Sequence, residues 1–186
     1  TIMELLNDFD TSVKKALTEI DSNWPKYKGI IVCGSHTPKN VEATLQIIRG
    51  ARETNIPFLG ICMGMQLMAI EYLRSIGLKE ANSQEIDPET SIPVISKMDK
   101  LRVGMLEAAW DSRITKESFW HNYEFNTNYL RWFKRDWDIE TCEGIVTYMK
   151  LRKNFIGVQF HPEYQSSKGR PHLLLKDFIN ECKLAM

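Results

Sequence analysis

One cysteine stands between two glycines where a predicted strand meets a predicted helix. Gly60, Cys62 and Gly64 form the pattern Gly-x-Cys-x-Gly, the cysteine counterpart of the nucleophile elbow. The glycines permit a turn that is too tight for larger side chains. A sulfur at the start of a helix lies near free N–H groups and the positive end of the helix dipole, which favour the reactive thiolate. The pattern predicts a nucleophilic cysteine, although a buried cysteine in an ordinary strand–helix turn has the same spacing.

His161 and Glu163 supply the second chemical feature. They stand two residues apart after the apolar run 155–160, which is a predicted strand. Side chains two apart on a strand share a face, and a carboxylate beside an imidazole fixes its tautomer and stabilises the imidazolium. Alone, the pair also fits a histidine at a strand end beside an unrelated glutamate. Together with the cysteine turn, it indicates a Cys–His–Glu triad.

The other three histidines carry weaker signals. His121 lies in an aromatic stretch, which favours a packing role, and His172 follows Pro171 and is expected at the surface. His36 lies in a loop expected to face Cys62, and its role stays open. The four cysteines include no C-x-x-C pair and no His or Cys spacing repeats. We therefore expect no metal site and no cofactor.

Strands and helices alternate in the part of the chain that must position these residues. The predicted strands are 29–33 and 56–61, and the predicted helices are 41–54 and 65–76. This order indicates parallel strands joined by right-handed crossovers, as in a doubly wound α/β sheet. In such sheets function gathers at the carboxyl ends of the strands. Gly34-Ser35 and Cys62 both follow a predicted strand, so we expect them at the same edge.

After about residue 92 the sequence no longer alternates between strand and helix patterns. Short apolar pieces at 92–95, 101–106 and 119–125 indicate a small antiparallel excursion near the site. The remaining predicted elements are a helix at 12–20, a short helix capped by Asn126 and running to 133, strands at 144–151 and 155–160, and a closing helix at 173–184. The whole pattern predicts an α/β fold with a mostly parallel sheet.

Length and charge argue against a nucleic-acid-binding or membrane protein. The chain has 186 residues, with 24 Lys and Arg against 24 Asp and Glu, so electrostatics gives no reason to expect binding to nucleic acid or to an anionic membrane. No apolar run approaches the roughly 20 residues that span a bilayer, and no signal peptide is visible. The four separated cysteines suit reduced thiols. We expect a single cytoplasmic domain, residues 1–186, with a small-molecule substrate.

Two stretches of the sequence resemble the catalytic signatures of class I glutamine amidotransferases. They are Ile56–Gln66, with the cysteine turn, and Val158–Tyr164, with the His-Pro-Glu sequence. Within that superfamily the chain most resembles the glutaminase domain of CTP synthase and short proteins related to its C-terminal region. Further similar stretches are 80–85, 123–126 and 170–173, and the resemblance runs from about residue 29 to 178. It implies the flavodoxin-like fold of this family.

The resemblance also implies thioester chemistry. Cys62 would attack the side-chain amide carbon of glutamine, and Glu163 would orient His161. His161 would protonate the departing ammonia and then activate the water that hydrolyses the thioester. The implied function is ammonia release from glutamine in pyrimidine nucleotide biosynthesis, with a synthetase partner that accepts the ammonia. Nothing in the chain resembles the ATP- and UTP-using synthetase domain, so it corresponds to a stand-alone relative or an excised domain.

At the positions where the family contacts substrate, this chain matches the family at some residues and differs from it at others. The resemblance implies substrate-binding and oxyanion roles for Gly34, Ser35, Met63, Gln66 and Glu85. CTP synthase has Gly-Gly-Phe-Gly where this chain has Gly34–Thr37, and the place of a family arginine holds Trp120, with Asn122 nearby. These departures keep two alternatives open. One is a hydrolase of another γ-glutamyl amide or peptide, and the other is a non-catalytic regulatory or binding relative.

Overall fold

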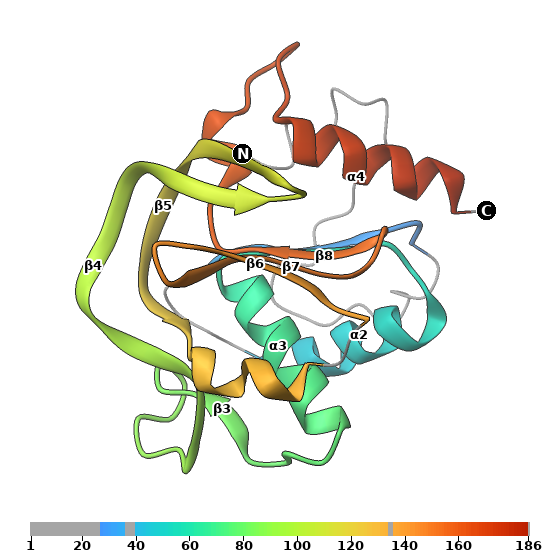
Figure 1. Ribbon diagram of the computed structural model, residues 1–186. Coiled ribbons are helices and arrows are strands. Elements are labelled where there is room, and N and C mark those ends of the chain that lie inside the picture. The colour runs from blue at the N-terminus through green and yellow to red at the C-terminus, as the bar shows by residue number, and fades with distance from the viewer. Residues whose placement is uncertain (1–26, 36–39, 134–135, 186) are drawn as a thin grey trace.

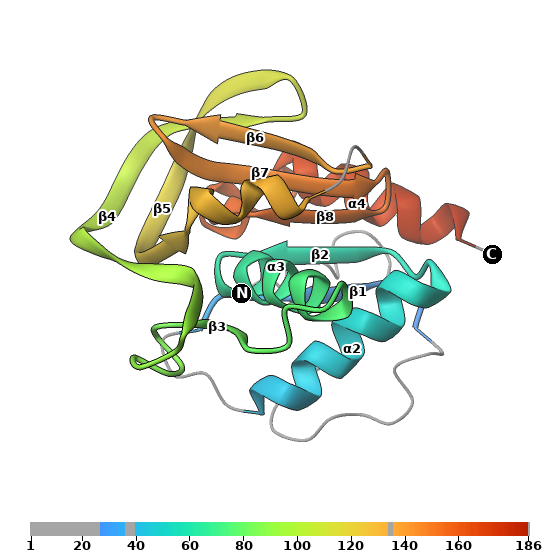
Figure 2. The ribbon, with the colours of Figure 1, turned by 60° about the horizontal axis from the view of Figure 1, so that its bottom comes forward.

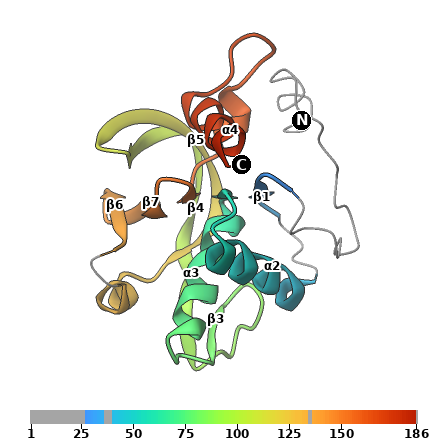
Figure 3. The same cartoon turned by 90° about the vertical axis from the view of Figure 1, so that its right-hand side faces the viewer.

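The computed structural model describes residues 27–35, 40–133 and 136–185 (Figure 1). The predicted helix at 12–20 and the loop residue His36 lie outside these ranges. The described chain forms a central sheet with helices on both faces, beside a long hairpin (Figures 1 and 3). This α/β arrangement is the one predicted from the alternation of strands and helices.

The central sheet has the strand order β1-β2-β8-β7-β6. Its strands are β1 (Ile30–Val32), β2 (Phe58–Ile61), β8 (Phe155–Val158), β7 (Ile145–Arg152) and β6 (Asp138–Cys142). The β1–β2 and β2–β8 pairings are parallel, whereas β8–β7 and β7–β6 are antiparallel. The sheet is therefore mixed, and its parallel half holds the strand ends that carry the predicted site. The sequence analysis did not predict β6.

Helices α2 (Val41–Thr54) and α3 (Met63–Ser75) cover one face of this sheet, and α4 (Leu173–Leu184) covers the other (Figures 1 and 3). The bounds of α2 and α4 are those predicted from their apolar periodicity. Helix α3 begins two residues earlier than predicted, directly after the cysteine. No helix within the described ranges is both long and apolar enough to cross a membrane.

A second sheet contains a long two-stranded hairpin beside the first (Figure 2). Strand β4 (Ile92–Trp110) pairs in antiparallel fashion with β5 (Arg113–Phe125), and the short β3 (Ala81–Ser83) pairs with the start of β4. The predicted antiparallel excursion is confirmed, and its short apolar pieces join into two continuous strands. The turn between them places Asp111 and Ser112 at φ 48° and 62°, which matches the positive φ angles of a two-residue hairpin turn.

The segment after the hairpin begins as predicted and forms a 3-10 helix. The side chain of Asn126 accepts a hydrogen bond from the backbone N–H of Asn128 at 3.1 Å and caps η2 (Thr127–Trp132). The amide of Asn126 also donates to the carbonyl oxygen of Pro93 at 3.2 Å. These bonds attach the end of β5 to the start of β4.

Side chains from alternate positions of β2 build two cores, one on each face of the sheet. Phe58 belongs to the cluster under α2 and α3, and Leu59 belongs to the cluster under α4, as expected from the alternation of side chains along a strand. A Cβ added at Gly157 of β8 would lie 2.6 Å from side-chain atoms of Met65 and Met68. Helix α3 therefore packs directly on the sheet, which fixes where its first turn lies.

Candidate active site

Cys62 occupies a sharp turn between β2 and α3. Its φ of 53° and ψ of −108° are rarely adopted by a residue other than glycine. A Cβ added at Gly60 would lie 2.5 Å from the carbonyl carbon of Gly64, and one added at Gly64 would overlap the carbonyl of Val32. Both glycines are needed for strand and helix to approach this closely. The predicted tight turn is confirmed, and the sulfur lies at the N-terminus of α3.

His161 and Glu163 meet through a helical turn. Strand β8 ends at Val158, and the 3-10 helix η3 (Pro162–Gln165) begins directly after His161. Nδ1 of His161 lies 2.7 Å from Oε1 of Glu163. The expectation that the pair shares a strand face is wrong, although the contact that it implied is present. The backbone N–H of His161 donates to the carbonyl oxygen of Ser118 at 2.8 Å, so β5 holds this turn in place.

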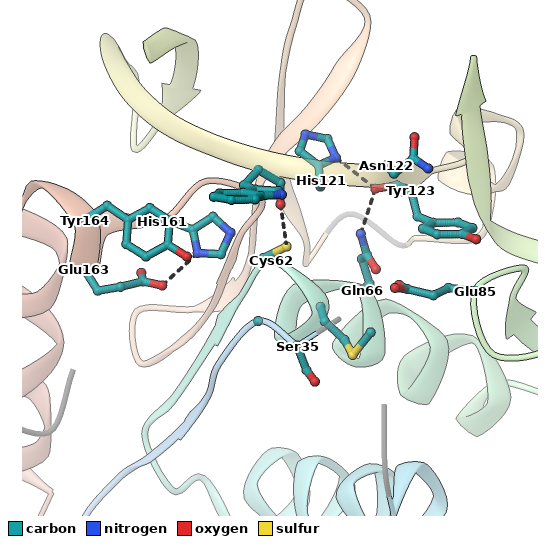
Figure 4. Close-up of a pocket in the computed structure, with 13 residues that line it drawn as sticks. Ser35, Cys62, Gln66, Glu85, His121, Asn122, Tyr123, His161, Glu163 and Tyr164 are labelled. Atoms are coloured by element: carbon teal, nitrogen blue, oxygen red, sulfur yellow. Dashed lines mark hydrogen bonds and ion pairs between the residues drawn. The ribbon is translucent and has the colours of Figure 1, made fainter. Parts of the chain in front are cut away.

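The imidazole of His161 faces the sulfur of Cys62 (Figure 4). Burial alone would lower the pKa of His161, but its interactions with Cys62 and Glu163 outweigh burial and raise the pKa from 6.5 to about 10. Nε2 of His161 makes no hydrogen bond to another described group, which leaves it available for the sulfur. Because Nδ1 donates to a carboxylate, the geometry fits an imidazole that exchanges a proton with Cys62 through Nε2.

Gly34 packs closely against both of these side chains. A Cβ added at Gly34 would lie 3.0 Å from Cε1 of His161 and 3.7 Å from Sγ of Cys62. Tyr164 stacks on the same imidazole, with ring centroids 4.6 Å apart and planes 6° apart. These contacts restrict the ring to the orientation that faces the sulfur.

One pocket contains all of the site residues predicted from the sequence. Three peptide segments supply most of its wall: the loop after β1, the cysteine turn with α3, and β5. The residues that line it are Gly34, Ser35, Cys62, Met63, Gln66, Glu85, Trp120, His121, Asn122, Tyr123, His161, Glu163 and Tyr164. Residues far apart in the sequence therefore converge, while their roles in catalysis and binding stay predictions.

The sequence analysis missed Gln159, which touches the sulfur. Its side chain is fully buried, and its Nε2 donates to Sγ of Cys62 at 3.5 Å. Its Oε1 accepts from Nε2 of Gln66 at 3.2 Å, and Gln66 also donates to the carbonyl oxygen of Tyr123 at 2.9 Å. The available signal was composition, because Gln159 is the one polar residue in the apolar run 155–160, which leads directly into His161.

His121 both packs and lines the pocket. Its ring lies 5.7 Å from that of Phe119, as expected from the aromatic stretch. Its Nδ1 lies 2.9 Å from the carbonyl oxygen of Tyr123, and a carbonyl only accepts, so Nδ1 carries the proton. Burial lowers the pKa of His121 to about 4, so this ring is neutral at physiological pH.

The side chain of His172 is only 11% exposed, so the prediction of a surface position is wrong. Its Nε2 lies 3.1 Å from a carboxylate oxygen of Glu117, which is itself buried. Its Nδ1 accepts from the backbone N–H of Leu174 at 3.2 Å and caps α4. Because Glu117 lies 55 residues earlier, no local pattern could reveal the pair. Within the described ranges, no three His, Cys, Asp or Glu side chains are grouped as ligands for a metal ion.

The described residues that line the pocket include two carboxylates and the imidazole of His161, whose raised pKa keeps it positively charged. Glu85 and Glu163 contribute carboxylates, and no lysine or arginine is among the described residues that line it. Trp120 of β5 stands where the resemblance places a family arginine, and Asn122 lies nearby on the same strand. Figure 4 shows Glu85 and Asn122 beyond Gln66, on the side of the pocket away from Glu163.

Comparison with known proteins gives matches over most of the chain. The model of the family described as glutamine amidotransferase class-I matches residues 5–181. The CTP synthase of Clostridium acetobutylicum is 36% identical over 187 residues, covering 86% of this chain and 35% of the relative. The CTP synthase of Moorella thermoacetica is 38% identical, covering 84% of this chain and 34% of the relative. The chain thus spans about a third of the length of these relatives.

A solved structure supports the same fold. The glutaminase domain of Trypanosoma brucei CTPS, with bound acivicin, superposes with a TM-score of 0.82 at 22% identity. The superposition covers 98% of this chain and 87% of that domain. The strand order, the helices on both faces and the long hairpin therefore form a known arrangement.

Proposed function

This chain belongs to the class I glutamine amidotransferase family, and from that premise we propose that it is a cysteine-dependent glutaminase that releases ammonia from glutamine. The observation that carries the proposal is the convergence of Cys62, His161 and Glu163 on one pocket. The bond between His161 and Glu163, and the sulfur facing the imidazole, give the geometry of a nucleophile, a base and an orienting acid.

The reaction proceeds through a γ-glutamyl thioester. The thiolate of Cys62 attacks the amide carbon, and the amide C–N bond breaks as His161 gives its proton to the departing nitrogen. His161, now neutral, takes a proton from a water molecule, whose oxygen attacks the thioester carbon. The C–S bond breaks, glutamate leaves, and the thiolate and the imidazolium are restored. Glu163 keeps the imidazole in the required tautomer throughout.

Backbone N–H groups stabilise the oxyanion of each tetrahedral intermediate. Met63 opens α3, so its N–H lacks a partner within the helix and lies next to the attacking sulfur. Ser35, in the loop after β1, lines the same pocket and supplies the second donor. Loss of one such donor lowers the rate on the order of a hundredfold or more.

The far side of the pocket holds the amino-acid portion of the substrate. Glu85 places a carboxylate there for the α-ammonium group, and Gln66 lies between Glu85 and the sulfur (Figure 4). An ammonium paired with a carboxylate forms a charge-assisted hydrogen bond. Together these groups orient the side-chain amide toward Cys62.

Ammonia release and covalent labelling test this proposal. The wild-type protein should release ammonia from glutamine, and Cys62→Ala should reduce the rate to background. Acivicin, which the T. brucei domain binds, should add once to the wild type and not to Cys62→Ala, as measured by intact mass. A wild-type rate equal to that of Cys62→Ala, with no labelling, would instead support a non-catalytic binding relative.

We further propose that residues 1–186 act as one domain in the cytoplasm. Both hydrophobic cores pack against the same sheet, which supports a single unit. All four cysteines are free, and the glutathione and thioredoxin of the cytosol keep thiols reduced. Disulfide formation between them under cytosolic redox buffer would contradict this.

We propose that a synthetase partner uses the ammonia that this chain releases. The matched relatives are CTP synthases about three times as long as the matched region. A test is to mix this chain with the synthetase part of one of those relatives, ATP and UTP. CTP formation from glutamine should then require Cys62, whereas formation from added ammonia should not. If CTP forms only from added ammonia, this partner is wrong.

The charge of the pocket favours a second candidate, a γ-glutamyl compound whose α-carboxylate is masked. The described lining offers no lysine or arginine for a carboxylate, and Asn122 is neutral. The α-N-methylamide of glutamine keeps the ammonium and the γ-amide, and it can release ammonia only from the latter. Turnover equal to or faster than that of glutamine would favour this candidate. Asn122→Arg should then shift the preference toward glutamine about tenfold or more.

A further inference from the structure

Gln159 and the proposed nucleophile Cys62 occupy adjacent positions at the ends of two neighbouring strands. Val158 pairs with Ile61 in the parallel β2–β8 ladder, so the next residue on each strand is Gln159 and Cys62. The backbone N–H of Cys62 donates to the carbonyl oxygen of Val158 at 2.7 Å. The side chain of Gln159, fully buried, reaches the sulfur with its Nε2 at 3.5 Å.

Neighbouring groups determine which way the side-chain amide of Gln159 points. The carbonyl oxygen of Tyr123 can only accept, so Gln66 must present its NH₂ group to it, at 2.9 Å. The same NH₂ lies 3.2 Å from the side chain of Gln159, which must therefore present its oxygen there. The NH₂ group of Gln159 is left facing Cys62. A flipped amide would place two donors against each other and an acceptor against the sulfur.

A fixed donor at this distance favours the anionic form of the sulfur. Hydrogen bonds to a charged acceptor are roughly twice as strong as those to a neutral one, and burial strengthens them further. From this geometry we propose that Gln159 is a further catalytic residue, which stabilises the thiolate of Cys62 before attack and again when the thioester is hydrolysed. The inference rests on the proposed function, in which Cys62 is the nucleophile.

Gln159 acts alongside other groups that face the sulfur. His161 provides the positive charge and the proton, whereas Gln159 exchanges no proton at all. The carbonyl oxygen of Trp120 lies 3.9 Å from the sulfur on the hairpin side and opposes the thiolate weakly. The other titratable groups that line the pocket are Glu85, His121, Tyr123, Glu163 and Tyr164.

The pH dependence of Cys62 alkylation tests this role. The rate of reaction with iodoacetamide is followed by peptide mass for Cys62 alone, without substrate, and the pH of half-maximal rate is recorded. Gln159→Leu should raise this pH by about one unit, which corresponds to about 1.4 kcal/mol. Gln159→Glu, which keeps the volume but places an acceptor at the sulfur, should raise it further.

A control and a double variant separate the amide's effect from a general change in structure. Thr147→Val alters another fully buried polar side chain, one that donates to the carbonyl oxygen of Ala109 at 2.7 Å. It should leave the alkylation midpoint in place. Gln66→Leu frees the amide of Gln159 to rotate and should raise the midpoint by less than Gln159→Leu, with no added effect when both are changed.

The results of these experiments distinguish a failure of this inference from a failure of the proposed function. An unchanged midpoint in folded Gln159→Leu overturns the inference alone. If that variant does not fold, the alkylation midpoint is measured in Gln159→Met and in Gln66→Leu instead. Unchanged midpoints in both variants also overturn the inference. If wild-type Cys62 reacts no faster than Cys33, Cys142 and Cys182 and releases no ammonia from glutamine, the proposed function itself fails.

Discussion

Replacing Glu163 by glutamine should lower the pKa of His161 while leaving the shape of the site intact. The imidazole and the carboxylate are 2.7 Å apart, and the side chain of Glu163 is 15% exposed. Glutamine can still accept a hydrogen bond from Nδ1 through its amide oxygen. The substitution therefore removes the negative charge and keeps the contact.

The size of the effect follows from the loss of charge. Burial opposes the imidazolium, and Cys62 and Glu163 together raise the pKa of His161 to about 10. Hydrogen bonds to charged groups contribute about 1.5–3 kcal/mol, against about 1 kcal/mol for neutral pairs. The difference is about 0.5–2 kcal/mol, which corresponds to a fall of about one pKa unit. The same loss of imidazolium stabilisation should slow ammonia release about 10-fold or more.

Histidine NMR measures the shift residue by residue. His161 in Glu163→Gln should titrate about one unit lower than in the wild type, as followed through its ring carbon and nitrogen signals. His121 is an internal control, because its partner is the carbonyl oxygen of Tyr123 and its pKa is lowered to about 4 by burial. An unchanged titration of His161, together with full activity, would refute the role assigned to Glu163.

The stability of the same variant should depend on pH in a defined direction. The folded-state pKa of His161, about 10, lies above its ordinary value of 6.5. Its contribution to stability is therefore fully present below about pH 6.5 and is lost as the pH rises through about 10. Glu163→Gln should be less stable than the wild type at about pH 6, and the two should converge near pH 10. Urea unfolding at both pH values checks this.

Three further substitutions test the scaffold. Glu71→Gln removes the charge and one of the two acceptor oxygens that bond Arg52 at 2.8 Å, at a side chain that is 5% exposed, and should cost about 3 kcal/mol in urea unfolding, whereas the surface variant Glu53→Gln should cost nothing measurable. Gly64→Ala places a methyl group against a carbonyl of β1 and should lower the melting temperature sharply together with acivicin labelling. Asn126→Ala removes the cap of η2 and its bond to β4, and should cost about 1–2 kcal/mol by the same urea measurement.

The tight turn at Cys62 was predictable because its requirements are local. A tight strand–helix junction needs small residues on both sides of Cys62, so the sequence shows them at fixed spacing. Helices α2 and α4 were predictable for a similar reason, since each buries one continuous apolar face. The contact between His161 and Glu163 was predicted from the wrong geometry, because a short helical turn and a strand both bring residues of this spacing together.

The hairpin and the buried polar groups depend on distant parts of the chain. The turn at Asp111-Ser112 lacks the glycine that marks such turns, and β4 has few buried positions along its middle, so neither strand shows a strong pattern. Gln159 belongs to an apolar run and His172 follows a proline. Their polar partners are supplied by segments 55 to 97 residues away along the chain, which sequence spacing cannot reveal.

The register of the β2–β8 pairing determines which side chains of the proposed active site lie beside the sulfur of Cys62. Each residue along a strand advances about 3.3 Å, so a slip of two residues between these strands would keep every side chain on its proper face. It would nevertheless carry the amide and the imidazole roughly 6–7 Å from the sulfur. A molecule with such a slip would still look well folded by circular dichroism, yet it would be inert. Enzymatic turnover per mole of protein therefore reports how much of a preparation has aligned Ile61 with Val158.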